Sequence, residues 1–263
     1  LQYIQEYYIY YDKYKEEYHR LNINNTDNAI PFGKYRTYSF VYMEDSFQKI
    51  NISVKEDSET IMESLLHAEE LALIPPTWSE KRKKTFVMGR LAAKQAMESY
   101  GTTTYPVLRG SMNEPLWPDT FKGSIAHKDN IAIAAVTKDP SYAGIGIDIE
   151  DAHSFLDTTH ARLFCVDEEL TYVEENSFNA TLFFSIKESV VKANYMAYGK
   201  RTEMINVNCC KLLENRSCPK VKVKYILENR YIISLCMIYQ EKNKNNEKNL
   251  PKKQSKAFLA CWK

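Results

Sequence analysis

The chain has 263 residues, and 35 Lys and Arg against 34 Asp and Glu give a formal net charge of +1. That length predicts two lobes or one large domain, and 44% apolar with 13% aromatic residues is typical of a globular protein. The near-zero charge argues against a nucleic-acid-binding domain, and the chain has no run of about 18 apolar residues that would span a membrane.

The first residues and the cysteines indicate the expected cellular location of the protein. The first 20 residues are rich in Tyr, Glu and Lys, and they lack the basic start and apolar middle of a signal peptide. Six cysteines occur without a CxxC pair, so a Cys-based zinc site has little support. An even number of cysteines also permits disulfides, but without a secretory signal we expect reduced thiols and a cytoplasmic location.

The first half of the chain carries clear helix and strand signals. Ser79 precedes a long helical pattern as a typical N-cap, and Gly101 follows that pattern as a typical stop. The apolar run that starts at Ile131 predicts a strand buried on both faces. In chain order, we expect a Tyr-rich helix within 1–20, strands at 37–43 and 49–55, helices at 57–73 and 80–100, a loop at 105–121 and a strand at 131–136.

The turn at Asp139, Pro140 and Ser141 is the expected boundary between two lobes. We therefore predict an N-terminal lobe at 1–140 and a C-terminal lobe at 141–263. The second lobe is expected to contain a strand at 142–150, helices at 167–175 and 181–198, strands at 221–226 and 231–239, a solvated loop at 241–255 and a short strand at 256–262.

The strand predicted at 142–150 carries two acidic residues on one face. By the period of two, Asp148 and Glu150 share a face with Gly146, while isoleucines occupy the other face. Two neighbouring carboxylates repel each other unless a positive charge lies between them, and a hard divalent cation such as Mg²⁺ prefers oxygen ligands. The alternative is a strand that ends at the surface with its acids in water.

The helix predicted at 181–198 carries opposite charges. Phe184, Glu188, Lys192 and Tyr195 lie on one stripe by their spacing of three and four residues. Periodicity alone favours an exposed Glu188–Lys192 helix pair, whereas the flanking aromatic side chains favour a half-buried pair at a functional site.

The basic helix predicted at 80–100 has a composition that suits phosphate binding. Arg82 and Arg90 lie about two turns apart, and Arg is the side chain that contacts phosphate through two hydrogen bonds. A solvated basic face is the alternative. His127 is expected between a Gly-Ser turn and a buried strand, where a lone histidine is more often structural than catalytic.

Four sequence blocks occur in order between about residue 81 and residue 200. They are the basic helix at 81–93, Asn-Glu-Pro-Leu-Trp-Pro at 113–118 with Gly-Ser-Ile-Ala-His at 123–127, Gly-Ile-Asp-Ile-Glu at 146–150, and Lys-Glu-x-x-x-Lys at 187–192. Together they resemble the 4′-phosphopantetheinyl transferases of the large single-chain type, and within that family the enterobactin synthase component D-like branch.

Three positions depart from the family's pattern. Asn113 replaces a glycine, and Asn tolerates the left-handed backbone better than most residues. Ala126 replaces a hydroxyl residue before the histidine, which removes one hydrogen bond to a ligand. Phe184 replaces a tryptophan, a smaller aromatic ring in the same place.

The resemblance implies an α/β (α+β) fold of two similar lobes, related by pseudo-twofold symmetry. Each lobe would be a small, mainly antiparallel sheet packed with helices, and coenzyme A would lie between the lobes. By the same resemblance, Asp148, Glu150 and Glu188 hold Mg²⁺ or Mn²⁺, Arg82, Arg90, Ala126, His127, Asp148 and Lys192 bind coenzyme A, and Glu188 and Lys192 are catalytic.

The implied reaction transfers 4′-phosphopantetheine from coenzyme A to a serine of an apo carrier protein and releases 3′,5′-ADP. The enzyme would be a monomer that serves nonribosomal peptide, siderophore or polyketide synthesis. Two alternatives remain at this point, a catalytically weak relative that only docks carrier domains and a Mg²⁺-dependent phosphohydrolase.

Overall fold

The computed structural model describes residues 35–41, 49–56, 63–101, 105–153, 156, 158–214, 220–228 and 230–241. The expected Tyr-rich helix and the expected strand at 256–262 lie outside these residues, as does nearly all of the loop at 241–255.

The described residues form two successive groups of helices and strands. The first group contains β1 (Tyr35–Val41), β2 (Lys49–Glu56), η1 (Glu63–Leu65), α2 (Ala68–Leu71), α3 (Glu80–Glu98), β3 (Leu108–Arg109), β4 (Pro115–Leu116), β5 (Lys122–Lys128) and β6 (Ile131–Thr137). The second contains β7 (Tyr142–Asp151), α4 (Thr158–Ala161), α5 (Asp167–Glu175), α6 (Phe178–Tyr198), η2 (Met204–Asn206), α7 (Cys209–Leu213), β8 (Val221–Glu228) and β9 (Tyr231–Tyr239).

Each group builds a small antiparallel sheet. The first sheet has the order β1-β2-β6-β5 and the second has the order β7-β9-β8, while β3 and β4 form a separate hairpin. In the first half two sheet strands precede the long helix and two follow it, in the second half one precedes and two follow, and in both halves the last strand lies inside its sheet. This confirms the expected mixed fold of antiparallel sheets packed with helices, and the pseudo-twofold relation between the halves stays a prediction.

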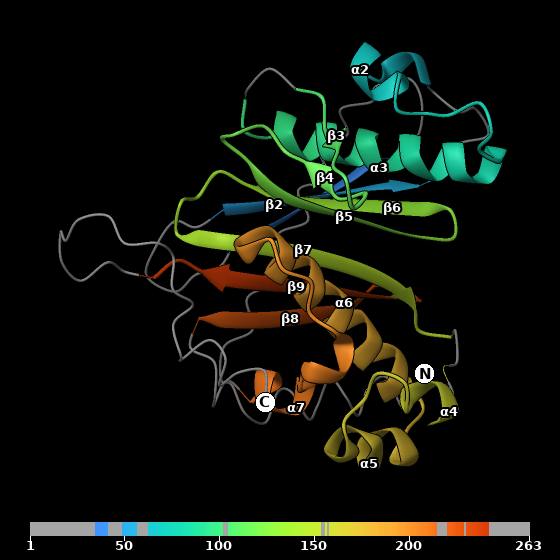
Figure 1. The fold of residues 1–263 in the computed structure, drawn as a ribbon, viewed down its shortest axis with the longest axis vertical. Helices are drawn as coiled ribbons and strands as arrows, with labels where there is room; N and C mark the ends of the chain where they lie inside the picture. Colours follow the sequence, from blue (N-terminus) through green and yellow to red (C-terminus); the bar gives the residue numbers. More distant parts are fainter. Residues whose placement is uncertain are drawn as a thin grey trace.

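The two sheets lie between the two long helices. Figure 1 shows α3 above the first sheet and α6 crossing the second sheet. Isoleucines of β7 meet Ile133 and Ala135 of β6 in an apolar cluster shared by both sheets. Alternate residues of β6, Ala134 and Val136, pack on Ala92, Ala93 and Ala96 of α3. Strand β6 is thus buried on both faces, as its continuous apolar run predicted.

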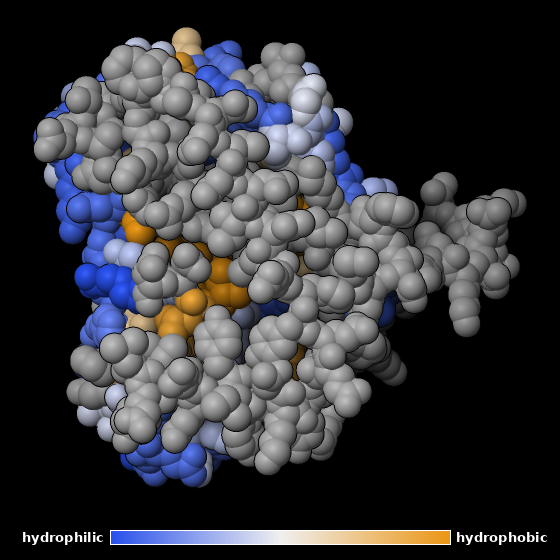
Figure 2. Space-filling view, turned by 180° about the vertical axis from the view of Figure 1, so that it is seen from behind, coloured by the Kyte–Doolittle hydropathy of each residue, from blue (hydrophilic) through white to orange (hydrophobic). Residues whose placement is uncertain are grey.

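The opposite side of the molecule shows apolar surface near its middle, between hydrophilic residues of the upper and lower parts (Figure 2). None of the described helices combines the length and the apolar character needed to cross a bilayer. The four cysteines in the described part of the chain are buried free thiols, at 165, 209, 210 and 236.

Helix α6 packs unusually close to strand β7. A Cβ on Gly144 would lie 2.3 Å from the carbonyl oxygen of Ala193, so only glycine permits this approach. Gly144 and Gly146 lie on the face of β7 that also carries Asp148, because side chains alternate along a strand. This close contact brings the charged residues of α6 to the acidic residues of β7.

Two sequence predictions in the first half are wrong. In the described part of 57–73, no continuous helix forms, because His67 has an extended backbone and starts the short helix α2. The Gly123–Ser124 pair forms no turn but lies within strand β5. The ring of Trp117 fills the space where a Cβ of Gly123 would stand, at 2.5 Å, so this glycine serves packing.

Candidate active site

The centre of the site is a pair of charged contacts between β7 and α6. Lys192 Nζ lies 2.7 Å from Asp148 Oδ1 and donates to the Ile147 carbonyl oxygen at 3.2 Å. Asp148 is only 5% exposed. Its second oxygen, Oδ2, is buried and has no hydrogen-bond partner among the described residues. A buried carboxylate oxygen without a partner is costly, so this atom indicates a place for a ligand.

A second lysine joins the acidic pair from the other half of the chain. Lys128, the last residue of β5, places Nζ 2.5 Å from Oε2 of Glu150 on β7. Burial raises the pKa of Glu150, the hydrogen bond from Lys128 opposes that rise, and the negative charge of Asp148 adds to it. The two carboxylates therefore repel each other, as their spacing on one strand face predicted.

Glu188 of α6 belongs to the same neighbourhood. Burial raises the pKa of Glu188, and the charge of Asp148 raises it further, while Lys192 and Arg201 lower it. All four residues of the predicted stripe on α6 are half-buried, and Lys192 contacts Asp148 of β7, while Phe184 packs against Phe164.

His127 and Ala126 of β5 lie at the edge of this group in different ways. The His127 side chain is exposed, and the pKa of its imidazole is lowered by partial desolvation and by Lys192, against the opposing charge of Asp148. Ala126 is 3% exposed and packs in the apolar cluster between the sheets. Ala126 therefore presents no exposed side chain to a ligand.

The donor set suits a hard divalent cation, although no three His, Cys, Asp or Glu side chains gather closely enough to hold one within the residues that the structure describes. The negative charge of Asp148 acts on the carboxylates of Glu150 and Glu188, and Asp148 Oδ2 has no partner among the described residues. Oxygen-only ligands of this kind are those that Mg²⁺ and Mn²⁺ accept. The two lysines supply the positive charge here.

Three arginines gather around two aromatic rings at the start of α3. Arg82 lies 4.7 Å and Arg109 lies 5.4 Å from the centre of the Trp78 ring, and Arg90 lies 4.4 Å from the Phe86 ring. The two rings meet edge to face at 5.5 Å. The structure thus brings Arg82 and Arg90 into one cluster and adds Arg109 to it.

Arg90 is the buried member of this cluster. It is 7% exposed, its Nη2 donates to the Leu108 carbonyl oxygen at 3.4 Å, and its Nε has no partner among the described residues. Burial lowers the pKa of Arg90 to about 10, Glu70 opposes this, and the charge of Arg109 contributes to it. Crowded guanidinium groups with an open donor favour an anionic ligand such as phosphate.

The β3–β4 hairpin connects the arginine cluster with α6. Arg109 lies on β3, and Glu114, just before β4, accepts a hydrogen bond of 3.3 Å from the Tyr195 hydroxyl of α6. Tyr195 is one helical turn beyond Lys192. Asn113 at the hairpin tip has φ 65°, the left-handed backbone that its residue type was expected to tolerate.

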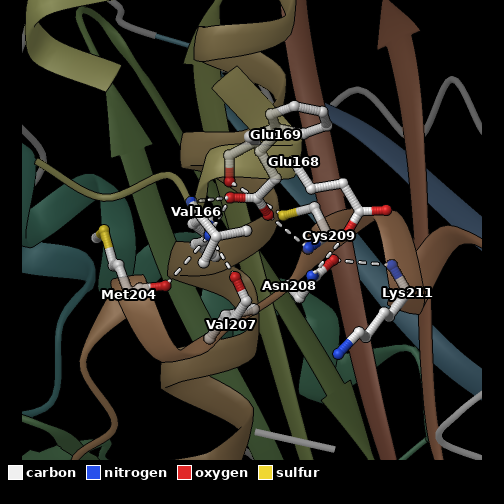
Figure 3. Close-up of polar contacts among 10 residues, drawn as sticks. Val166, Glu168, Glu169, Met204, Val207, Asn208, Cys209 and Lys211 are labelled. Atoms are coloured by element: carbon white, nitrogen blue, oxygen red, sulfur yellow. Dashed lines mark hydrogen bonds and ion pairs between the residues drawn. The ribbon is translucent and has the colours of Figure 1, made fainter. Parts of the chain in front are cut away.

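A fully buried ion pair supports α6 beneath the site. Lys187 Nζ lies 2.8 Å from Glu169 Oε2 of α5, and it donates to the carbonyl oxygens of Met204 and Val207. Glu169 in turn accepts from the backbone N–H groups of Val166 and Cys209 (Figure 3). The pair joins α5, α6 and the start of α7, so Lys187 fixes the helix that carries Glu188.

Sequence reasoning missed the residues whose role depends on contacts across the fold. Lys128, Arg109 and Trp78 reach the site from another strand or loop, and no local spacing signals such a contact. The one available signal for Lys128 was its position directly after His127.

Comparison with known proteins identifies the family to which both halves of the chain are similar. The family model for the 4′-phosphopantetheinyl transferase N-terminal domain matches residues 69–137, and the model for the 4′-phosphopantetheinyl transferase superfamily matches residues 144–237. Enterobactin synthase component D of Escherichia coli (strain K12) is 31% identical over 172 residues, which cover 59% of this chain and 77% of that protein.

Two further relatives match shorter parts. Enterobactin synthase component D of Salmonella typhimurium is 34% identical over 137 residues, or 50% of this chain and 55% of the relative. The 4′-phosphopantetheinyl transferase Svp of Streptomyces mobaraensis is 33% identical over 141 residues, or 52% and 57%. The chain therefore belongs to the 4′-phosphopantetheinyl transferases, enzymes that transfer phosphopantetheine from coenzyme A to a carrier protein.

Proposed function

We propose that this transferase is metal-dependent and that it moves 4′-phosphopantetheine onto a serine hydroxyl of an apo carrier protein, with release of 3′,5′-ADP. The single observation that carries this proposal is the buried, unpartnered Oδ2 of Asp148, whose negative charge acts on the carboxylates of both Glu150 and Glu188. These buried carboxylates need positive charge close by, and Lys128 and Lys192 supply only part of it.

Asp148, Glu150 and Glu188 are the residues that would hold Mg²⁺ or Mn²⁺. When bound, the cation would neutralise charge on the pyrophosphate of coenzyme A. Lys192, which contacts Asp148 at 2.7 Å, would remain close enough to the same phosphates to stabilise the charge that develops as the leaving group departs.

Other residues would bind the remaining phosphate and orient the substrate. Arg82 and Arg90 would contact the 3′-phosphate, with Arg109 beside them on the Trp78 ring. His127 and the backbone of Ala126 would contact a phosphate from β5, which belongs to the first half of the chain. Contacts from both halves would hold the pyrophosphate in line with the incoming serine, the positioning that dominates phosphoryl transfer.

Glu188 is the proposed general base. In the metal-free protein burial raises the pKa of Glu188, so this carboxylate holds a proton more tightly than an ordinary glutamate, and as a ligand of the proposed metal it would lie beside the reacting phosphate. The serine oxygen forms a bond to the β-phosphorus, and its proton passes to Glu188. The bond between that phosphorus and the bridging oxygen breaks, and the bridging oxygen leaves with 3′,5′-ADP.

The lobe boundary and the cellular role are part of the same proposal. We place the boundary between residues 140 and 141, in the link between β6 and β7, which belong to different sheets. The relatives named enterobactin synthase component D support service to siderophore or other nonribosomal peptide synthesis, with polyketide synthesis as the alternative. We expect a monomer that uses both lobes for one active site.

Mass spectrometry of an intact apo peptidyl carrier protein tests the reaction. The carrier is incubated with the chain, coenzyme A and Mg²⁺, and a second sample contains EDTA. We expect the carrier to gain one phosphopantetheine only with metal and 3′,5′-ADP to appear in equal amount. Equal modification in EDTA would refute metal dependence, and coenzyme A binding without modification of several carriers would favour a docking protein.

A further inference from the structure

The Lys128–Glu150 pair links the two halves of the chain at the proposed metal site. Lys128 ends β5 of the first sheet, and Glu150 lies near the end of β7 of the second sheet. Their charged atoms are 2.5 Å apart, and the side chains are only 28% and 16% exposed. A partly buried pair of this kind interacts more strongly than a pair in water.

The two acids of β7 are neutralised in different ways. Asp148 contacts Lys192 through Oδ1 alone and keeps Oδ2 free of any partner among the described residues, so a cation can reach Asp148 beside Lys192. Glu150 contacts the ammonium group of Lys128 directly. A dication that uses Glu150 would meet this positive charge at contact distance, and like charges at such a distance repel strongly.

We propose that Lys128 is a resident counter-ion that competes with the divalent cation for Glu150 and thereby lowers the metal affinity of the site. The inference rests on the proposed function, because it assumes that Glu150 is a metal ligand. Lys128 stabilises the metal-free protein by offsetting the repulsion between Asp148 and Glu150. The metal must displace it before Glu150 can bind.

The local structure permits this displacement without moving the sheet. The residues after Lys128 form a tight turn to β6, in which Asp129 has φ 50°. The ammonium group sits on a flexible four-carbon stem, and the side chain is already 28% exposed. Lys128 can therefore turn toward solvent while its backbone keeps its pairing with Ile131.

The test measures Mn²⁺ binding to the full chain without coenzyme A, by electron paramagnetic resonance of free Mn²⁺. Lys128→Gln and Lys128→Met remove the counter-ion and are expected to tighten binding by about tenfold. Lys128→Arg keeps the charge and should bind like wild type. Lys122→Gln, at the other end of β5, makes the same change in net charge and should also bind like wild type.

Each result decides between the proposals. Unchanged or weaker Mn²⁺ binding in both Lys128→Gln and Lys128→Met, or equal tightening in Lys122→Gln, would overturn the role of Lys128 and leave the transferase proposal intact. Failure of wild-type protein to bind Mn²⁺, or binding that survives Asp148→Asn, would overturn the metal site itself. Carrier modification measured in parallel shows whether the protein still transfers phosphopantetheine if the metal site is absent.

Discussion

The carbonyl oxygen of Ser189 lies so close to Gly146 that a Cβ on this glycine would stand 1.9 Å from it. The strand and the helix that share the site are thus in backbone contact. Gly146→Ala should push α6 away from β7 and separate Lys192 from Asp148. We expect a loss of about 1–3 kcal/mol in the free energy of unfolding and a larger loss of activity, measured by denaturant titration and carrier modification.

The matched control for that change is Ile145→Val on the opposite face of β7. It trims one methyl group from the apolar cluster and should cost about 0.5–1.5 kcal/mol while transfer is retained. Similar losses of activity in the two variants would mean that the close approach of α6 has no special role.

Asp148→Ala should abolish transfer and leave the fold intact. The change removes an acid that Glu150 repels but also the ion-pair partner of the half-buried Lys192, so its two effects on the stability of the metal-free protein oppose each other, whereas the proposed site loses a central ligand. We expect carrier modification to fall at least about 100-fold, with a melting temperature close to wild type. Near-wild-type turnover would remove Asp148 from the site.

The arginine cluster predicts a selective change in coenzyme A affinity. Arg82→Ala removes an exposed guanidinium and should weaken coenzyme A binding about tenfold or more, as expected for hydrogen bonds to a charged group. Dephospho-coenzyme A, which lacks the 3′-phosphate, should bind the variant and the wild type equally. Calorimetry with both ligands makes the comparison, and a parallel loss for both would place Arg82 elsewhere.

Arg90→Ala should weaken coenzyme A binding as well, but with a lower melting temperature. Arg90 is buried against Phe86 and bonded to Leu108, so its removal leaves a cavity. Unchanged coenzyme A affinity in a folded Arg90→Ala protein would show that this arginine only supports the cluster.

The raised pKa of Glu188 predicts a pH-dependent stability in the absence of metal. A carboxyl whose folded pKa is raised binds its proton more tightly when folded. Its contribution to stability is full below the ordinary pKa of 4.5 and is lost as pH rises through the higher folded pKa. Glu188→Gln cannot ionise, so it should melt higher than wild type at pH 7 in EDTA and show no such gain near pH 4.5. A constant difference across this range would contradict the assignment.

The Lys187–Glu169 pair predicts a large structural effect. Lys187→Met leaves Glu169 buried without its cation and should lower the free energy of unfolding by about 3–5 kcal/mol in denaturant titration. The double variant with Glu169→Gln should recover part of that loss, because the uncompensated charge is gone. Two losses that simply add would show that the residues do not act as a pair.

Local patterns predicted much of the fold. Helix α3 begins after Ser79, whose side chain accepts from the Arg82 backbone, and α5, β7 and β9 lie where their periodicity placed them. The helix predicted at 57–73 failed because Glu70 accepts from the backbone N–H groups of His67 and distant Val107, a tertiary contact that local propensity does not contain.

The residues of the candidate site likewise fall into those that local patterns predicted and those that only the tertiary structure reveals. Periodicity placed Asp148 and Glu150 on one strand face and Glu188 and Lys192 on one helix stripe, and the resemblance to the transferase family implied their roles. The contacts of Lys128 with β7 and of Arg109 with the Trp78 ring depend on how the two sheets and the hairpin pack, so no spacing along the chain revealed them.

The position of β9 between β7 and β8 also has a consequence for synthesis on the ribosome. Asp148 pairs in register with Ser234, so the strand that carries Asp148 waits for a partner that is translated more than 80 residues later. During that interval the isoleucine face of β7 can already pack on the completed first sheet, whereas its hydrogen-bonding edge awaits β9. The residues of the arginine cluster, at 78–109, are therefore translated well before β9, the strand that completes the sheet carrying Asp148.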